Sequence, residues 1–91
     1  MKRFGMFNIR YCQSFKEKYL KSLSKDDKER IRNFIETRIA AFPYEAGDPL
    51  KGKWSGFRKA RIGDYRIIYE IQEDIVVVLV VKIGHRKDIY R

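Results

Sequence analysis

The segment that most constrains the fold is FRKARIGDYRIIYEI, residues 57–71, in which two alternating runs flank one Gly-Asp pair. A Gly-Asp pair between alternating runs is typical of a two-residue β-hairpin turn. We therefore predict two antiparallel strands, at residues 57–62 and 65–71, joined at Gly63-Asp64. Because the turn fixes the register, it also fixes which side chains share a face of the sheet.

This register gathers positive charge on one face of the hairpin. With Ile62 opposite Tyr65, Arg61 lies opposite Arg66, although directly opposed like charges destabilise a sheet by roughly 0.2–1 kcal/mol. Lys59 shares their face because side chains alternate along a strand. A chain that accepts this arrangement either leaves the three cations in solvent or uses them to hold an anion.

The opposite face of the hairpin is mostly apolar and is expected to meet the helices. Its predicted members are Ala60, Ile62, Tyr65, Ile67, Tyr69 and Ile71. Arg58 also falls on this face. We expect Arg58 to lie near the end of the sheet with its charged group in water, since long basic side chains can extend past an apolar surface.

Two amphipathic helices are predicted before the hairpin. Ser14 and Glu17 fit a capping box, and Ser24 with Asp27 repeats that start signal. Apolar residues at helical spacing follow each start and give each helix one face for the core. They are Phe15, Tyr19, Leu20 and Leu23 in the first helix, and Ile31, Phe34, Ile35, Ile39 and Phe42 in the second. We expect the two helices to form an antiparallel hairpin.

The order of the predicted elements indicates the fold class. A weakly alternating strand ends at Tyr11, and Pro43 ends the second helix. Residues 43–56 contain Gly and Pro and read as a loop. The apolar segment 75–83 is predicted to be an interior strand. The order β-α-α-β-β-β argues for an α+β fold, in which residues 1–91 form one domain with a two-helix hairpin on one face of a small antiparallel sheet.

The positive charge of the chain is concentrated in two segments. There are 21 Lys and Arg residues against 12 Asp and Glu, for a net charge of +9. Residues 51–66 hold six positive side chains and one acid, and residues 82–91 hold four and one, so these segments supply +8 of the +9. This bias favours binding to nucleic acid, to an anionic surface or to an acidic partner protein.

Other features of the sequence disfavour several classes of protein. Cys12 is the one cysteine, so no intrachain disulfide is possible, and this fits the reducing cytoplasm. The N-terminus lacks the long apolar run of a signal peptide, and residues 75–81 are too few to span a bilayer as a helix. Acidic and histidine side chains are not clustered at metal-ligand spacing, so we expect no metal and no cofactor.

The second half of the chain resembles the RelE/ParE superfamily of bacterial and archaeal toxins. The resemblance is carried by LKGKWSGFRKARIGDYRIIYEI (50–71) and VVVLVVKIGHRKDIYR (76–91). It implies the order β-α-α-β-β-β and a cognate antitoxin from the same operon, which we expect to be acidic and RelB-like. It also implies one of two activities: RelE-like members cut messenger RNA in the ribosomal A site, whereas ParE-like members inhibit DNA gyrase and lack the nuclease residues.

The resemblance to the nuclease branch implies a set of candidate catalytic residues on the hairpin, at the end of the last strand and near the C-terminus. They are Lys59, Arg61, Arg66, His85, Arg86 and Tyr90. The chain departs from a well-studied RelE pattern in three ways. That pattern has two lysines where this chain has Lys59 and Arg61, its hairpin differs in length, and it has a lysine in place of His85, although other nuclease members use a histidine near the C-terminus.

Metal-independent RNA cleavage requires the ribose 2′-oxygen to attack the adjacent phosphodiester. Preorganised cations at the developing charge usually make the largest contribution to such a reaction. Arg61 and Arg66 suit that role because guanidinium groups match phosphate oxygens. Lys59 is a candidate for the base or for an electrostatic partner. In the alternative interpretation, these three cations form only a docking patch for an acidic antitoxin or for gyrase.

The remaining candidates lie at the C-terminal end of the sequence. His85 is a candidate base or acid, since imidazole exchanges protons near neutral pH. Arg86 is expected beside the leaving oxygen, and Tyr90 is expected to stack on a base or hold the 2′-hydroxyl. The sequence leaves open which residue is base and which is acid. Our interpretation is a ribosome-dependent endoribonuclease toxin acting on messenger RNA. The first alternative is a non-catalytic gyrase inhibitor. The second, which the sequence favours less, is a plain RNA-binding module or inactive remnant.

Overall fold

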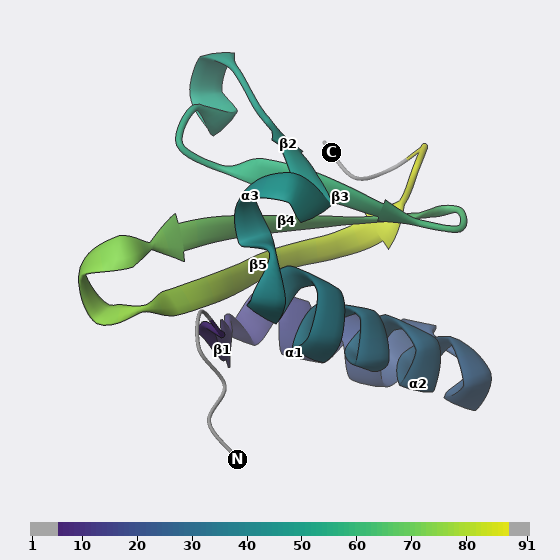
Figure 1. Ribbon diagram of the computed structural model, residues 1–91. Helices are drawn as coiled ribbons and strands as arrows, with labels where there is room; N and C mark the ends of the chain where they lie inside the picture. Colours follow the sequence, from purple (N-terminus) through teal and green to yellow (C-terminus); the bar gives the residue numbers. More distant parts are fainter. Residues whose placement is uncertain (1–5, 88–91) are drawn as a thin grey trace.

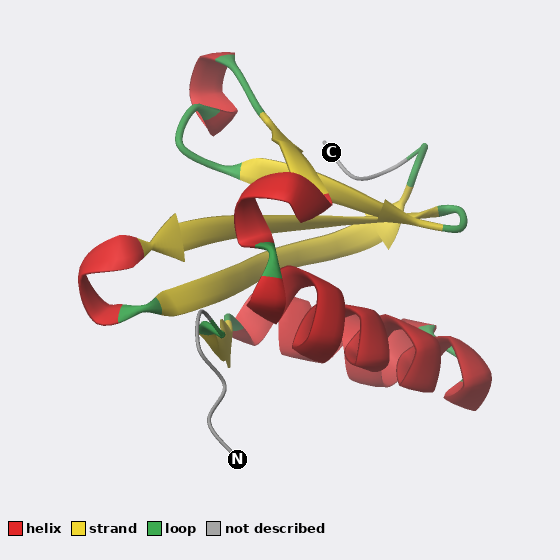
Figure 2. Ribbon diagram, in the orientation of Figure 1, coloured by secondary structure: helices red, strands yellow, loops and turns green. Residues whose placement is uncertain are grey.

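The structure is a computed structural model that describes residues 6–87, and it places the long helices on one face of a five-stranded sheet (Figures 1 and 2). The helices are α1 (Gln13–Ser22), α2 (Lys25–Phe34) and α3 (Pro43–Ala46). The strands are β1 (Asn8–Tyr11), β2 (Gly47–Pro49), β3 (Arg58–Ile62), β4 (Tyr65–Gln72) and β5 (Val77–His85). Their order across the sheet is β1-β5-β4-β3-β2.

The predicted α+β class is confirmed, with one difference in strand direction and one added strand. β5 lies between β1 and β4, which confirms its predicted interior position. β1 pairs with β5 in parallel, whereas all other neighbouring strands are antiparallel, so the sheet is mostly rather than wholly antiparallel. β1 and β5 are the first and last strands, and the connection between them contains the helices and the other three strands, which is long enough for the crossover that parallel neighbours require. The added strand is β2, which pairs with β3 at the other edge of the sheet.

The register predicted for the central hairpin is confirmed. Ile62 pairs with Tyr65 and Arg61 pairs with Arg66. Ile67 and Tyr69 are fully buried, so the apolar face meets the helices as expected. The main core cluster joins this face to α1 and α2 and contains Phe15, Leu23, Ile31, Ile35, Ile39, Ala60, Ile67, Tyr69, Val78, Val80 and Ile83.

The two helix starts behave differently. The Ser24 side chain accepts a hydrogen bond from the Asp27 backbone N–H at 3.2 Å, which confirms the predicted cap of α2. The predicted cap at Ser14 is wrong: the N-cap position is Cys12, two residues earlier, and the Ser14 hydroxyl instead donates to the Val81 carbonyl oxygen at 3.0 Å. α2 continues into a π-helical turn, η1 (Ile35–Ile39). None of the described helices is long and apolar enough to cross a membrane.

The apolar stripes of the helices are not buried throughout. Leu20 of α1 is 65% exposed and Phe42, after α2, is 50% exposed. Both were expected on core-facing stripes. Their neighbours on the stripes, Phe15 and Ile39, are buried, so the helical period is right, but Leu20 lines an open hollow between α1 and α2.

The segment 43–56, expected as a loop, contains regular structure. It holds α3, then β2, then a 3₁₀ turn, η2 (Gly52–Trp54). Arg58 helps to fix this segment, because its guanidinium donates to the backbone carbonyls of Gly47 at 3.1 Å and Tyr44 at 2.7 Å. The charged group of Arg58 is therefore bound by the protein backbone, whereas the sequence predicted that it would lie in water.

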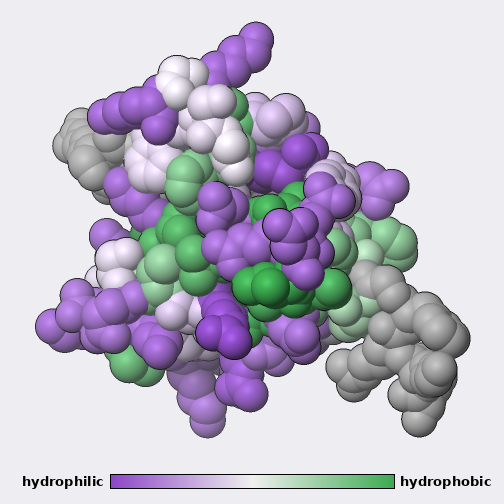
Figure 3. Space-filling model, turned by 90° about the vertical axis from the view of Figure 1, so that its left-hand side faces the viewer, coloured by the Kyte–Doolittle hydropathy of each residue, from purple (hydrophilic) through white to green (hydrophobic). Residues whose placement is uncertain are grey.

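The turn between β4 and β5 places apolar side chains in solvent. It is formed by the 3₁₀ turn η3 (Glu73–Ile75) and by Val76, so β5 starts two residues later than expected. Ile75 is 60% exposed and Val76 is 45% exposed. Figure 3 looks onto this end of the sheet and shows hydrophobic side chains among hydrophilic ones. Val76 has φ 54° and ψ 50°, a left-handed conformation that β-branched residues rarely adopt.

Replacing Val76 by Gly is expected to stabilise the folded protein. A left-handed conformation costs an L-residue roughly 1–2 kcal/mol, and glycine avoids that cost but loses more backbone entropy on folding. The net gain should be about 0.5–1 kcal/mol, measured as the free energy of unfolding in urea. Val76→Ala is the control, because it shortens the side chain without relieving the backbone. Equal changes in the free energy of unfolding for the two substitutions would show that the Val76 backbone is not strained.

Candidate functional site

The sheet face opposite the long helices carries two rows of basic side chains. In the first row Arg61 pairs with Arg66, and Arg66 pairs with Gly84. In the second row the cations are Lys59 and Lys82, which pair with Ile68 from its two sides. Paired residues in antiparallel strands point to the same face, so we define the cationic face as Lys59, Arg61, Arg66 and Lys82. Lys82 was not predicted from the sequence, because strict alternation along 77–85 would place it on the helix side with Val78 and Val80, and the irregularity between Ile68 and Tyr69 moves it to the other face.

The two arginines of the first row are held differently. Arg61 is exposed, whereas Arg66 is half-buried. The Nη1 atom of Arg66 donates to the carbonyl oxygens of Gly63 at 3.3 Å and Tyr65 at 3.1 Å. These bonds hold the guanidinium over the hairpin turn, so a cation is already positioned before any anion arrives. Preorganisation of this kind is what electrostatic catalysis requires.

Arg86 joins the same end of the sheet through the turn residue Asp64. The Arg86 backbone N–H donates to the Asp64 carbonyl oxygen at 2.8 Å, and its Nε lies 4.0 Å from the Asp64 carboxylate. Both side chains are exposed, so this ion pair contributes little to stability. Its effect is positional, since it keeps Arg86 at the tip that carries Arg61 and Arg66.

The structure does not bring His85 together with these cations. His85 pairs with Tyr65, which points toward the helices, and the two rings meet edge to face with their centroids 6.3 Å apart. Arg66 and Gly84 occupy the opposite face of the same strands. Of the candidates within residues 6–87, the cations therefore share one region, and the His85 ring lies behind it. Tyr90 lies outside the described residues.

Helix α2 fixes the hairpin turn from the helix side. The Tyr65 hydroxyl donates to the Asp27 carboxylate at 3.1 Å, and Arg30 pairs with the same carboxylate at 3.3 Å. Arg30 also packs close to Gly63, where a Cβ atom would lie 3.1 Å from its guanidinium. Burial, and next the hydrogen bond to Asp27, raise the pKa of Tyr65. The turn is thus bound on one side by α2 and on the other by Arg86.

Replacing Tyr65 by Phe is expected to lower the free energy of unfolding by about 1 kcal/mol, the usual net value of one hydrogen bond. Asp27→Asn should lower the free energy of unfolding less in the Tyr65→Phe background than in wild type, because the two groups form one contact. A double-mutant cycle in urea measures this. Because the pKa of Tyr65 is raised on folding, the contribution should be present below the ordinary tyrosine pKa and lost as pH rises above it. Additive effects at neutral pH would contradict the contact.

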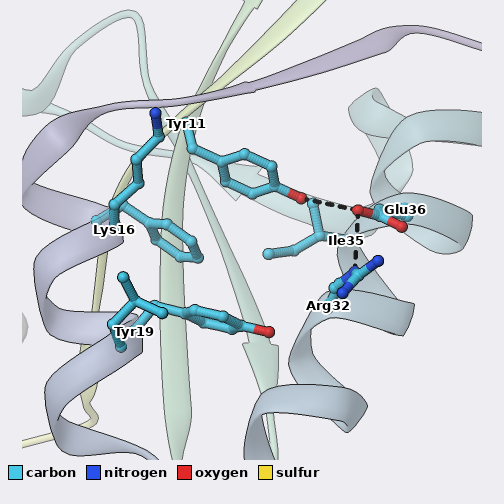
Figure 4. Close-up of a pocket in the computed structure, with 8 residues that line it drawn as sticks. Tyr11, Lys16, Tyr19, Arg32, Ile35 and Glu36 are labelled. Atoms are coloured by element: carbon cyan, nitrogen blue, oxygen red, sulfur yellow. Dashed lines mark hydrogen bonds and ion pairs between the residues drawn. The ribbon is translucent and has the colours of Figure 1, made fainter.

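A separate apolar hollow lies between α1 and α2, on the helix side of the sheet (Figure 4). Its volume is about 310 Å³, and one wall is a stack of Tyr11, Phe15 and Tyr19 with ring centroids 5.1 and 5.5 Å apart. The Tyr11 hydroxyl donates to Glu36 at 3.3 Å, and Arg32 pairs with the same carboxylate at 3.5 Å. Burial, and next the charge of Glu36, raise the pKa of Tyr11. This hollow contains none of the candidate residues.

Comparison with known proteins gives concordant matches. A family described as the ParE toxin of a type II toxin–antitoxin system, parDE, matches residues 13–90. Over 49 residues the chain is 39% identical to Toxin RelG and 37% identical to Toxin RelE, both of Mycobacterium tuberculosis. These alignments cover 54% of this chain and 56% and 50% of the relatives, so the chain spans about half the length of the curated relatives that it matches.

Solved structures share the fold over most of the chain. The toxin–antitoxin complex RelBE2 from Mycobacterium tuberculosis matches with a TM-score of 0.86 and 23% identity, covering 97% of this chain and 100% of that one. The intact RelBE toxin–antitoxin complex of E. coli matches with a TM-score of 0.74 and 18% identity, covering 87% and 95%. At these identities the likeness establishes a common fold.

Proposed function

The chain belongs to the RelE/ParE toxin superfamily of type II toxin–antitoxin systems, and from this premise we propose that it is a ribosome-dependent endoribonuclease. Its substrate is messenger RNA on the ribosome, and its site of action is the cytoplasm. The observation that carries the proposal is the row Arg61–Arg66, two opposed cations kept on the sheet face that the long helices leave uncovered. Like charges in that position weaken the sheet, so their presence is explained best by an anionic ligand.

The proposed reaction is cleavage by the ribose 2′-hydroxyl. A base removes the 2′-proton, the 2′-oxygen bonds to phosphorus, and the bond from phosphorus to the 5′-oxygen breaks. The products are a 2′,3′-cyclic phosphate and a 5′-hydroxyl, with a proton delivered to the leaving 5′-oxygen. Arg61 and Arg66 stabilise the charge that develops on the phosphate oxygens. Arg86, held at the same tip by Asp64, acts at the leaving side.

The position of His85 changes the balance between the candidate bases. Its ring lies behind the sheet against Tyr65, whereas Lys59 shares the face and the hairpin of the two arginines. We therefore assign the base or electrostatic partner role to Lys59 and a positioning role, through Tyr65, to His85. Lys59→Ala should reduce cleavage more than His85→Ala does. The reverse order, measured on one ribosome-bound message, would exchange the two roles.

The second candidate function is non-catalytic inhibition of DNA gyrase. It is favoured by the description of the matched family, which names the ParE toxin. Expression of the protein in a bacterial host separates the two. The nuclease predicts new 5′ ends in translated messages within minutes and unaffected plasmid supercoiling, whereas a gyrase inhibitor predicts the opposite pair of results.

The proposed partner is a cognate acidic antitoxin. Solved complexes of the same fold are RelB–RelE pairs, and the basic excess of this chain lies in the segments that form the cationic face. To the extent that exposed charges carry the association, its affinity should fall as salt rises from about 0.1 M to about 1 M, where the screening length drops to about 3 Å. Titration of the two purified proteins by calorimetry measures this. An affinity indifferent to salt, or a basic antitoxin, would contradict it.

A further inference from the structure

A groove adjoins the cationic face along the last residues of β5. Its volume is about 750 Å³, and the lining side chains that bear on its chemistry are Ser14, Lys18, Trp54, Phe57 and Lys82, with Gly84 between them and the arginine row. Gly84 pairs with Arg66, so the same residue belongs to the groove and to the first row of the cationic face. The two features are therefore neighbours on one continuous surface.

One wall of the groove comes from α1. β1 ends at Tyr11, opposite Val80, so it does not cover β5 beyond that point. The Ser14 hydroxyl donates to the Val81 carbonyl oxygen at 3.0 Å and seats the first turn of α1 against this edge. Lys18 follows four residues later, which places it one turn along the same helix face. Lys18 is exposed and brings a positive charge to the rim of the groove.

The other wall is aromatic and comes from the segment before β3. Trp54 and Phe57 pack edge to face with ring centroids 5.7 Å apart. The Lys82 ammonium lies 5.5 Å from the centre of the Trp54 ring, so the aromatic wall and the second cationic row are in contact. Aromatic rings beside lysines on a cationic surface are the combination with which proteins hold single-stranded nucleic acids.

We propose that this groove holds a nucleotide of single-stranded RNA that flanks the phosphodiester at Arg66. Its base packs against Trp54 and Phe57, and its phosphate lies between Lys18 and Lys82. The inference rests on the proposed nuclease function, because it extends the same RNA along β5 from the arginine row. An acidic peptide would satisfy the lysines but not the aromatic wall, so the structure favours the nucleotide.

Trp54 is the one tryptophan of the chain, and this makes the groove directly observable. The probe is a hexamer of 2′-O-methyl adenosine, which lacks the 2′-hydroxyl needed for cleavage. We expect it to quench Trp54 fluorescence saturably. Lys18→Ala should reduce the slope of log affinity against log salt by about 0.7, the value for one phosphate contact on a single strand. Lys21→Ala is the matched control, since Lys21 is an exposed lysine of the same helix outside the groove lining.

Base contact and charge contact are separated by two further measurements. Inorganic polyphosphate and hexaglutamate carry charge without bases, and neither should quench Trp54 as the hexamer does. Trp54→Ala should weaken binding of an end-labelled hexamer by about 5- to 100-fold, as read by anisotropy, if one base packs on the ring. Should this variant fail to fold, Lys18→Ala still decides the matter. Equal quenching by hexaglutamate, or equal losses in Lys18→Ala and Lys21→Ala, would overturn the proposal.

Failure of the groove proposal can be distinguished from failure of the proposed function. If wild type cuts ribosome-bound message but the hexamer leaves Trp54 fluorescence unchanged, the groove proposal falls and the nuclease stands. If the hexamer binds as expected and wild type cuts nothing, the nuclease falls and the groove remains an RNA site.

Discussion

Replacing Arg66 by Ala is expected to slow cleavage of ribosome-bound message by about 10²–10³, the usual cost of removing one preorganised charge donor. Stability should change by less than about 1 kcal/mol, because two opposing effects nearly cancel. The substitution removes the hydrogen bonds from Arg66 to Gly63 and Tyr65, and it also relieves repulsion from Arg61. Loss of activity would then be separable from loss of fold.

Primer extension on a single message, with thermal melts on the same samples, measures both quantities. The matched control is Arg10→Ala, which removes an exposed arginine from β1, away from the hairpin. Arg10→Ala should cut at the wild-type rate. If Arg66→Ala also cuts at that rate, the opposed arginines have a role other than catalysis. If it melts far below wild type, Arg66 is structural.

Replacing Gly47 by Ala is expected to destabilise the fold by on the order of 3 kcal/mol, the upper range for inserting a methyl group where packing is closed. A Cβ atom there would lie 2.7 Å from the Lys59 carbonyl oxygen and 2.7 Å from the Tyr69 hydroxyl oxygen. The strand backbone cannot yield as a flexible side chain can. The Tyr69 hydroxyl is itself buried and donates to the Pro43 carbonyl oxygen at 2.7 Å.

The expected fall in Tm for Gly47→Ala is about 15 °C for a chain of this size. The control is Gly52→Ala, where φ is +67° and nothing lies within 4 Å of the added methyl group. The free energy of unfolding of Gly52→Ala should fall only by the cost of a left-handed backbone at an L-residue, about 1–2 kcal/mol. A loss at Gly47 no larger than at Gly52 would show that β2 does not pack closely on β3.

The central hairpin was predictable because its turn and its alternation agree. Gly63-Asp64 fixes the register, and that register alone places Arg61 opposite Arg66 and buries Ile67 and Tyr69. The start of α2 at Ser24 was predictable for a similar reason, since the cap is made within four consecutive residues. Local signals of this kind do not depend on how distant segments pack.

The features that the sequence did not reveal depend on distant contacts. Ser14 fits a cap but bonds to Val81, on a strand 67 positions along the chain. β2 is three residues long and is a strand only because Gly47 lets the chain approach Ala60. The preference of each residue for helix or strand does not depend on contacts between distant segments, so it could not predict these features.

The candidate site also contains some residues that local signals could place and others whose positions depend on distant contacts. Arg61 and Arg66 were placed on their shared face by the hairpin register. The contact of Arg86 with the turn residue Asp64 was not predicted, because it joins segments that are distant in the sequence. The side of the sheet on which His85 lies depends on an irregularity in the pairing of β4 with β5, between Ile68 and Tyr69. A one-residue irregularity of this kind changes which residues of a strand share a face, and the sequence does not mark it.

The most direct test of the account is to incubate the purified wild-type protein with one message, once on translating ribosomes and once free in solution, and to map 5′ ends by primer extension. The account predicts cuts within the translated region of the ribosome-bound message, none in the free message, and undiminished gyrase supercoiling at the same protein concentration. Absence of cuts on the ribosome, together with inhibited supercoiling, would contradict it and identify the protein as a gyrase inhibitor.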